Sequence, residues 1–352
     1  MMPIIPTRRL CPILVAAALL LGHAGAAEPP ARTSLTDPSI RFTVPDKPYV
    51  VLRRGPIEAV VVDNRAVDDA VVPDHRAGYH GIGALKHVAQ PRNLFVPAYA
   101  GLNFEHIHDG TTQSREVLFE PRQATMQLRV IDAHTAELHQ PPTPFWGLES
   151  CARYELLDHG VVELTFECIP RRVTWKGDYL GLFWASYIGQ PQSLDIHFLG
   201  SPRNSEWVRG VTPEHGVRAT HRAQGDNPDF VHAADFPLSL VFNFSEYRFV
   251  EPWYFGECRG MAFAQMFRTE DQVRFSQSPS GGGASNPAWD FQWFIMTPVV
   301  GRRYQLVMRA LYLPLPEAKD EAAAREQVRR EIGRVQFPTK NSAKPSTNQA
   351  NL

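Results

Sequence analysis

Residues 151–168 read CARYELLDHGVVELTFEC, two runs rich in leucine, β-branched and aromatic residues on either side of a turn at Asp158-His159-Gly160. Alternating side chains that flank a glycine-containing turn are typical of a β-hairpin. A two-residue loop at His159-Gly160 sets Asp158 opposite Val161, because glycine supplies the positive φ of such a turn. The same register sets Cys151 opposite Cys168.

This register has a consequence for the cysteines. Counting outward from the turn, Cys151 and Cys168 fall on a non-hydrogen-bonded pair, in which the Cα atoms lie about 4.5 Å apart. A disulfide between them is one interpretation, and it requires an oxidising compartment. Two buried thiols lying side by side are the other. We predict the disulfide, with Cys258 left single.

Similar short runs, broken by Gly, Pro, Asn and Asp, recur along the chain. They predict strands over 57–62, 124–131, 136–139, 152–157, 161–169, 179–187, 194–199, 238–244, 261–267, 291–296 and 304–311. One helix is predicted at about 317–332, after Pro316. A parallel sheet would need a crossover helix after nearly every strand. The pattern therefore predicts a mainly β fold, a large antiparallel two-sheet sandwich with one C-terminal helix.

The N-terminus has the order of a secretory signal. Arg8 and Arg9 precede an apolar run over 13–21, and small residues follow up to Ala27. Nine apolar residues are fewer than the roughly 20 that span a bilayer, so a peptide cleaved near Ala27 is favoured over a membrane anchor. We predict a signal peptide over 1–27, a lead-in over 28–44, one domain over 45–338 and a disordered tail over 339–352. The mature protein is then secreted or periplasmic.

Charge limits the choice of partner. The net charge is −1 and the pI is near 6.9, so no basic surface favours nucleic acid or an anionic membrane. A small neutral or mixed ligand such as a carbohydrate fits better. The oligomeric state stays open.

The most unusual polar cluster is GLNFEHIHDG over residues 101–110. In a regular strand His106 and His108 share one face, whereas Glu105 and Asp109 share the other. Two imidazoles at i and i+2 can chelate a divalent metal ion together with a third ligand. Sugar contact, or a polar strand end entering a turn, are the other interpretations.

Further clusters place rings beside acids. The proline-rich stretch 138–149 holds His139, Trp146 and Glu149, and an aromatic plate beside a carboxylate suits a sugar. A connection whose tryptophan covers the core is the alternative. The other clusters contain Trp253 with Glu257, Trp289 with Asp290, and a glycine- and histidine-rich stretch over 74–87 that forms either a pocket wall or an exposed loop.

The hairpin at 149–170, the strand containing WDFQW at 289–293 and the strand at 304–311 also carry a resemblance. Over about 45–315 the rhythm of strands resembles secreted bacterial proteins with the β-supersandwich of galactose-mutarotase-like and polysaccharide-processing proteins. The resemblance implies a concave sheet face that binds carbohydrate. It assigns no catalytic role to any residue.

Together these features predict a secreted carbohydrate-active enzyme, either a glycoside hydrolase, a polysaccharide lyase or a sugar epimerase, that needs no cofactor. Carboxylate and imidazole groups would move protons, because glycosidic cleavage needs a proton on the leaving oxygen. The alternatives are a non-catalytic carbohydrate-binding protein and an enzyme with a divalent metal ion on His106 and His108. The predicted acid–base groups are His106, His108, His139 and Glu149. The predicted substrate contacts are Trp146, Trp253, Glu257, Trp289 and Asp290.

Overall fold

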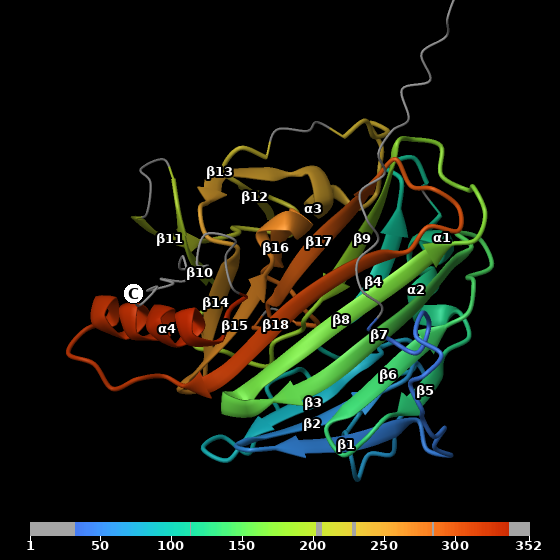
Figure 1. Ribbon diagram of the computed structural model, residues 1–352. Coiled ribbons are helices and arrows are strands. Elements are labelled where there is room, and N and C mark those ends of the chain that lie inside the picture. Colours follow the sequence, from blue (N-terminus) through green and yellow to red (C-terminus); the bar gives the residue numbers. More distant parts are fainter. Residues whose placement is uncertain (1–31, 113, 202–205, 227–229, 284, 338–352) are drawn as a thin grey trace, which may run out of the picture.

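A computed structural model describes residues 32–112, 114–201, 206–226, 230–283 and 285–337 (Figure 1). The predicted signal peptide at 1–27 and the tail at 339–352 lie outside them. The described chain is mainly β, as predicted. No helix in this part is long and apolar enough to cross a bilayer.

One sheet contains fifteen strands. They are β4 (Asn103–His108), β5 (Gln127–Val130), β6 (Thr135–Gln140), β7 (Leu148–Leu157), β8 (Val161–Pro170), β9 (Tyr179–Ala185), β10 (Ile196–Gly200), β11 (Glu206–Gly210), β12 (Thr220–Ala223), β13 (Phe244–Phe249), β14 (Trp253–Cys258), β15 (Met261–Phe267), β16 (Arg274–Ser278), β17 (Ala288–Met296) and β18 (Tyr304–Pro314). Their order is β4-β9-β17-β16-β12-β13-β10-β14-β15-β18-β8-β7-β6-β5, with β11 paired to β10. The pairs are antiparallel except β12 with β13.

This sheet folds over on itself, so that its two halves form the layers of a sandwich. Phe166 on β8 packs 4.9 Å from the rings of both Phe104 on β4 and Trp184 on β9, although β8 stands far from these strands in the sheet order. Phe291 on β17 likewise contacts Phe267 on β15. The core therefore lies between the halves, and the sandwich predicted as two sheets is built from one continuous sheet.

A second sheet of three strands, β1 (Tyr49–Arg54), β2 (Ile57–Val62) and β3 (Gly81–His87), lies along the β5–β7 side of the sandwich (Figure 1). Alternate residues of β2 explain its position. Ala59 and Val61 join the main core, whereas Val60 and Val62 pack in a cluster with Val72. Both faces of β2, the central strand of this small sheet, are therefore buried.

The predicted C-terminal helix is α4 (Glu321–Val335). It begins after Asp320, whose carboxylate accepts a hydrogen bond from the Ala323 N–H, and not after Pro316. Val328 and Ile332 bury against a cluster that includes Trp253. The other α-helices are single turns: α1 (Arg115–Leu118), α2 (Glu120–Gln123) and α3 (Ser239–Phe242).

The strand predicted over 238–244 is wrong, because α3 occupies most of it. β2 and β15 have the predicted bounds. The strands that the prediction missed include β3 and β16, whose sequences GIGALKH and RFSQS lack the usual alternation. Both are almost wholly buried, so the sheet and not local preference sets their conformation.

The hairpin at 151–168 forms, but its register differs by one residue from the prediction. Leu157 pairs with Val161, and the loop has three residues, with φ of 62° at His159 and 78° at Gly160. Cys151 therefore lies opposite Glu167, and Ser150 lies opposite Cys168. A shift of one residue moves every side chain to the other face. Cys151 and Cys168 are free thiols on opposite faces, which corrects the predicted disulfide.

Denaturing the protein without reductant should accordingly leave Cys151, Cys168 and Cys258 all open to alkylation. Reductant should leave the melting temperature unchanged, because the described residues contain no disulfide. Mass mapping of peptides from unreduced protein measures both thiols of the hairpin. A linked peptide that joins Cys151 to Cys168 would contradict the register.

The N-terminal segment, residues 32–36, belongs to the predicted lead-in over 28–44 and is fixed to the outer face of β6–β8. Glu167, which is wholly buried, accepts hydrogen bonds from the Arg32 N–H at 3.0 Å and the Thr33 hydroxyl at 2.7 Å. Glu137, also wholly buried, accepts the Ser34 N–H at 3.1 Å. Burying a carboxylate is unfavourable unless hydrogen bonds satisfy it, so this segment completes the sheet face.

Candidate functional site

A β-bulge in β4 decides which side chains face outward. Phe104 pairs with Trp184 and His106 pairs with the adjacent Phe183, so Glu105 is an extra residue on its strand. Phe104 lies in the core between the layers, whereas Glu105 and His106 both line a cavity on the outer face. The regular alternation predicted from the sequence, which separated Glu105 from His106, is therefore wrong.

Glu105 is buried but well supplied with partners. Its Oε1 accepts a hydrogen bond from the Tyr187 hydroxyl at 2.6 Å and from Arg122 Nη1 at 3.1 Å. Burial raises the pKa of Glu105, and the Arg122 charge opposes that shift. Desolvation therefore favours the neutral acid, whereas the guanidinium and the Tyr187 hydroxyl favour the carboxylate.

His106 lies beside this carboxyl. Its Nε2 is 3.4 Å from Glu105 Oε2 without hydrogen-bond geometry, and neither ring nitrogen has a hydrogen-bond partner in the described chain. Burial holds the pKa of His106 well below its usual value, with further lowering from the positive charges of Arg122 and Arg115. The imidazole is therefore neutral, and it packs against Phe119 and Phe183.

Asp290 reaches the same cavity from β17. Alternation on this strand sends Trp289 and Phe291 into the core and Asp290 outward. Its Oδ1 accepts the Ser186 N–H at 2.9 Å. Burial raises the pKa of Asp290 well above its usual value, and the neighbouring charge of Glu105 raises it further. Burial thus favours the protonated form of Asp290, and no cationic partner in the described chain opposes it.

The cavity measures about 300 Å³. Aromatic side chains give it apolar walls, and polar side chains interrupt them, including His215, whose Nδ1 is 2.8 Å from the Ser278 hydroxyl oxygen. The cavity is lined by Glu105, His106 and Asp290 and by His215 and Ser278. The rest of the lining consists of Tyr79, Arg115, Phe119, Arg122, Phe183, Tyr187, Pro237, Leu238, Leu240, Ser280 and Ala288.

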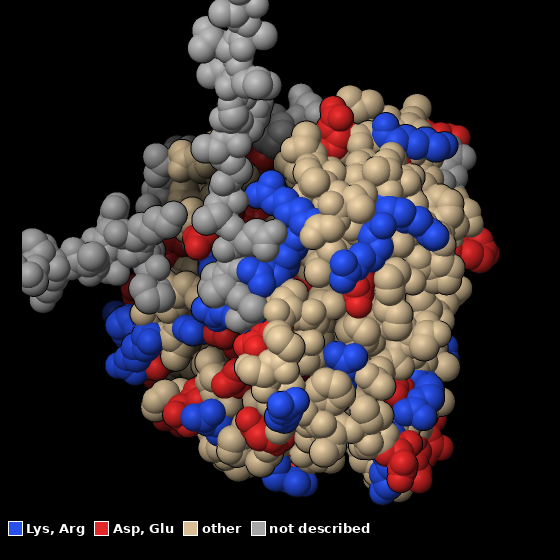
Figure 2. All heavy atoms as spheres, turned by 45° about the vertical axis from the view of Figure 1, so that its right-hand side comes forward, with Lys and Arg blue, Asp and Glu red and all other residues tan. Residues whose placement is uncertain are grey.

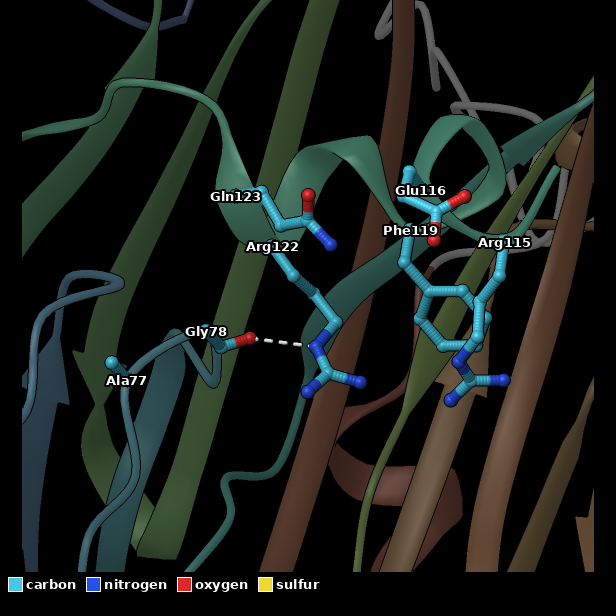
Figure 3. A pocket seen from close by; sticks show the side chains of 7 residues that line it. All are labelled: Ala77, Gly78, Arg115, Glu116, Phe119, Arg122 and Gln123. Atoms are coloured by element: carbon cyan, nitrogen blue, oxygen red, sulfur yellow. Dashed lines mark hydrogen bonds between the residues drawn. The ribbon is translucent and has the colours of Figure 1, made fainter.

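A second cavity of about 300 Å³ adjoins the first (Figure 3). Both are lined by Arg115, Phe119 and Arg122, and the second adds Ala77, Gly78, Glu116 and Gln123. In Figure 3 the two guanidinium groups point the same way on either side of the Phe119 ring, and Arg122 Nε donates to the Gly78 carbonyl at 2.8 Å.

His108 does not line the cavity, although it shares a sheet face with His106. Its ring covers Gly181, where an added Cβ would lie 2.3 Å from the imidazole, and Phe236, Phe242 and Phe294 surround it. Burial lowers the pKa of His108 to about 3. Among the described residues no group of three or more His, Cys, Asp or Glu side chains is placed to hold a metal ion. A metal on His106 and His108 stays a prediction.

His139 and Glu149 do contact each other, but elsewhere. On β6 and β7, His139 Nε2 lies 3.3 Å from Glu149 Oε1, and Arg171 Nε donates to the same carboxylate at 2.6 Å. Burial lowers the pKa of His139, against the opposing charge and hydrogen bond of Glu149. Neither residue lines the cavity with Glu105, so the structure places the His139–Glu149 pair apart from the Glu105 and Asp290 clusters.

The three tryptophans predicted as stacking surfaces are structural. Each is at most 1% exposed. The indole N–H of Trp146 donates to the Val117 carbonyl, that of Trp253 to the Glu251 carboxylate, and that of Trp289 to the Leu194 carbonyl.

Glu257 also lies away from the cavity. It is half-buried beside α4, and burial raises its pKa. The rings that do face the cavity are Tyr79, from the glycine-rich stretch for which a pocket wall was one of two interpretations, and Phe119, Phe183 and Tyr187, which the prediction missed. No sequence pattern marked Phe119, Phe183 and Tyr187 as site residues, because the cavity brings together segments that lie far apart along the chain.

Charged side chains do not form one large patch on the visible face of the molecule. Figure 2 shows both signs interspersed there, with broad uncharged areas between them. This agrees with the nearly balanced composition.

Comparison with known proteins gives similarity of architecture only. No family model and no curated protein sequence matches the chain. A putative aldose 1-epimerase from Escherichia coli K12 is 11% identical with a TM-score of 0.45, covering 76% of this chain and 99% of its own. A GalM/aldose epimerase homologue from C. elegans is 7% identical with a TM-score of 0.41, covering 76% and 99%.

Heparan sulfate lyase HepC from Pedobacter heparinus, in a mutant form, is 9% identical with a TM-score of 0.40. The match covers 80% of this chain and 38% of the lyase. All three TM-scores lie below 0.5, so the function proposed below rests on the cavity alone.

Proposed function

We propose that the chain binds a saccharide in the Glu105 cavity and acts on it by acid–base chemistry. One observation carries the proposal: two buried carboxyls, Glu105 and Asp290, line one cavity, and burial raises the pKa of both while only Glu105 has a guanidinium partner. Titratable groups whose environments separate their pKa values are the usual basis for pairing an acid with a base.

The roles follow from the partners. Arg122 and the Tyr187 hydroxyl favour the ionised form of Glu105, so Glu105 is the base that accepts a proton from the ligand. Asp290 has no cationic partner among the described residues and keeps its proton, so it is the acid that donates to a glycosidic or ring oxygen. Neutral His106 is a further hydrogen-bonding group at the same wall.

The lining suits a sugar. The rings of Tyr79, Phe119 and Phe183 offer faces for C–H groups, whereas Ser278, His215 and the carboxyls offer partners for hydroxyls. Hydrolysis, elimination and epimerisation each need one proton removed and one delivered. We further propose that the protein acts after export, with the signal peptide over 1–27 removed.

The test is a screen of the mature protein against neutral and acidic glycans for new reducing ends, new double bonds or anomer interconversion. With an active substrate, Asp290→Asn should lower kcat by about 100-fold, because the donated proton is lost. Thermal stability should be unchanged or higher. Burial raises the folded-state pKa of Asp290, so its contribution to stability is lost as pH rises through that value, and asparagine avoids this loss.

Glu149→Gln distinguishes this cavity from the His139–Glu149 pair. It should leave kcat within about twofold. If Glu149→Gln loses activity while Asp290→Asn keeps it, the active site lies at the His139–Glu149 pair on β6 and β7 and not at the Glu105 cavity. Binding without turnover of any glycan would make the protein a carbohydrate-binding module.

A further inference from the structure

Arg115 is the cation of the cavity that has no acid partner in the described chain. Its guanidinium lies 4.1 Å from the centre of the Phe119 ring, a cation–π contact that holds it at the cavity wall. Its charge lowers the pKa of both Glu105 and His106, so it acts on the same space as the proposed acid–base groups. The side chain is nevertheless exposed to solvent and so accessible to a ligand.

Arg122, the other cation of the cavity, is paired with Glu105, and burial keeps His106 neutral. Asp290 accepts a hydrogen bond from the Ser186 N–H and makes no ion pair in the described chain. Glu116 lies next to Arg115 in the chain, but its carboxylate accepts the Ser114 hydroxyl at 2.8 Å and lines only the second cavity. Arg115 is therefore the cation of the Glu105 cavity that no described carboxylate pairs.

The position of Arg115 sets where an anion would bind. It lines both cavities, together with Phe119 and Arg122 (Figure 3). A sugar ring against Glu105 and Asp290 would thus bring a substituent within reach of the guanidinium. Guanidinium binds carboxylate, sulfate and phosphate oxygens in a bidentate manner, which adds both energy and orientation.

We propose that the ligand of this cavity is an anionic saccharide, whose carboxylate, sulfate or phosphate group binds Arg115. This inference rests on the proposed function, because it names the substrate class of the same site. Arg115 is then a specificity-determining residue, and the acid–base groups act on the ring that it holds in place.

The test uses the mature full-length chain and titration calorimetry with four probes: glucose, glucuronate, glucose 6-sulfate and glucose 6-phosphate. At least one anionic probe should bind more than tenfold tighter than glucose, and that advantage should shrink as salt concentration rises. The three anionic probes identify which group the site prefers.

Arg115→Gln should remove the anionic advantage, by about tenfold or more, so that the anionic probes bind no tighter than glucose does. Arg115→Lys should restore part of it, because the charge returns without the planar fork. Arg302→Gln is the matched control, since Arg302 also lies over a ring, Tyr304, but outside both cavities. The Arg302→Gln variant should bind all four probes with the same affinities as the parent protein.

Equal affinity for glucose and all three anionic probes would overturn the inference, and so would an anionic advantage that survives in Arg115→Gln. Inorganic sulfate separates this failure from failure of the proposed function. Sulfate binding that depends on Arg115, with no saccharide bound, would support the anion site and reject the saccharide. Saccharide turnover that depends on Asp290 but not on Arg115 would support the proposed function and reject the anion site.

Discussion

Glu105→Gln is expected to lower kcat by about 10²–10⁴-fold and to leave the melting temperature within a few degrees. Glutamine keeps the shape of the side chain and its hydrogen bond from Tyr187, but it cannot accept a proton. In the parent protein the acid limb of the pH–rate profile should fall above pH 4.5, the ordinary pKa of the group, because burial raises the pKa of Glu105. Steady-state kinetics across pH measure both effects.

Asp271→Asn is the matched control for this variant. Asp271 is also a buried carboxyl paired with an arginine, Arg268, at 2.8 Å, and burial raises its pKa too, but it lies outside the cavity. The Asp271→Asn variant should change the melting temperature about as little as Glu105→Gln does, and it should keep its kcat. A Glu105→Gln variant that is as active as Asp271→Asn would reject Glu105 as the base.

Deleting the N-terminal segment, residues 32–36, is expected to lower the free energy of unfolding by about 1–3 kcal/mol. It removes hydrogen bonds to two buried carboxylates, whereas Arg153 still pairs with Glu137 and Gln305 still donates to Glu167. Glu167 would lose the Arg32 N–H and the Thr33 hydroxyl, and Glu137 would lose the Ser34 N–H. Urea denaturation of the mature and shortened chains measures the difference.

Two further variants identify the cause. In the shortened chain, replacing Glu167 by Gln should recover part of the stability, because a neutral amide is less costly to bury than a carboxylate. Glu137 is kept in this variant because it also pairs with Arg153. A synthetic peptide of residues 32–38 should raise the melting temperature of the shortened chain. If the deletion shifts the free energy by less than about 0.5 kcal/mol, within the range of a surface change, the segment does not stabilise the fold.

How far the sequence predicted this molecule differs from feature to feature. The local patterns of β2, β15 and α4 lie within a single element, where alternation or helical spacing is visible, and they predicted those elements well. The hairpin at 151–168 was predicted as a hairpin but in the wrong register. The loop can have two or three residues, depending on the backbone conformations of His159 and Gly160. The one extra loop residue shifts the register and places Cys151 and Cys168 on opposite faces of the sheet.

The site required still more distant information. The sequence by itself determined a mainly β chain and marked the stretches around Glu105 and Asp290 as polar clusters beside rings. Only the tertiary structure decided that these two carboxyls line the same cavity, because β9 pairs with β4 on one side and β17 on the other. It also decided that Glu105 faces outward with His106, since a bulge adds one residue to a strand without leaving any period in the sequence. Side-chain alternation is encoded locally, whereas register and strand order are set by packing between segments far apart in the chain.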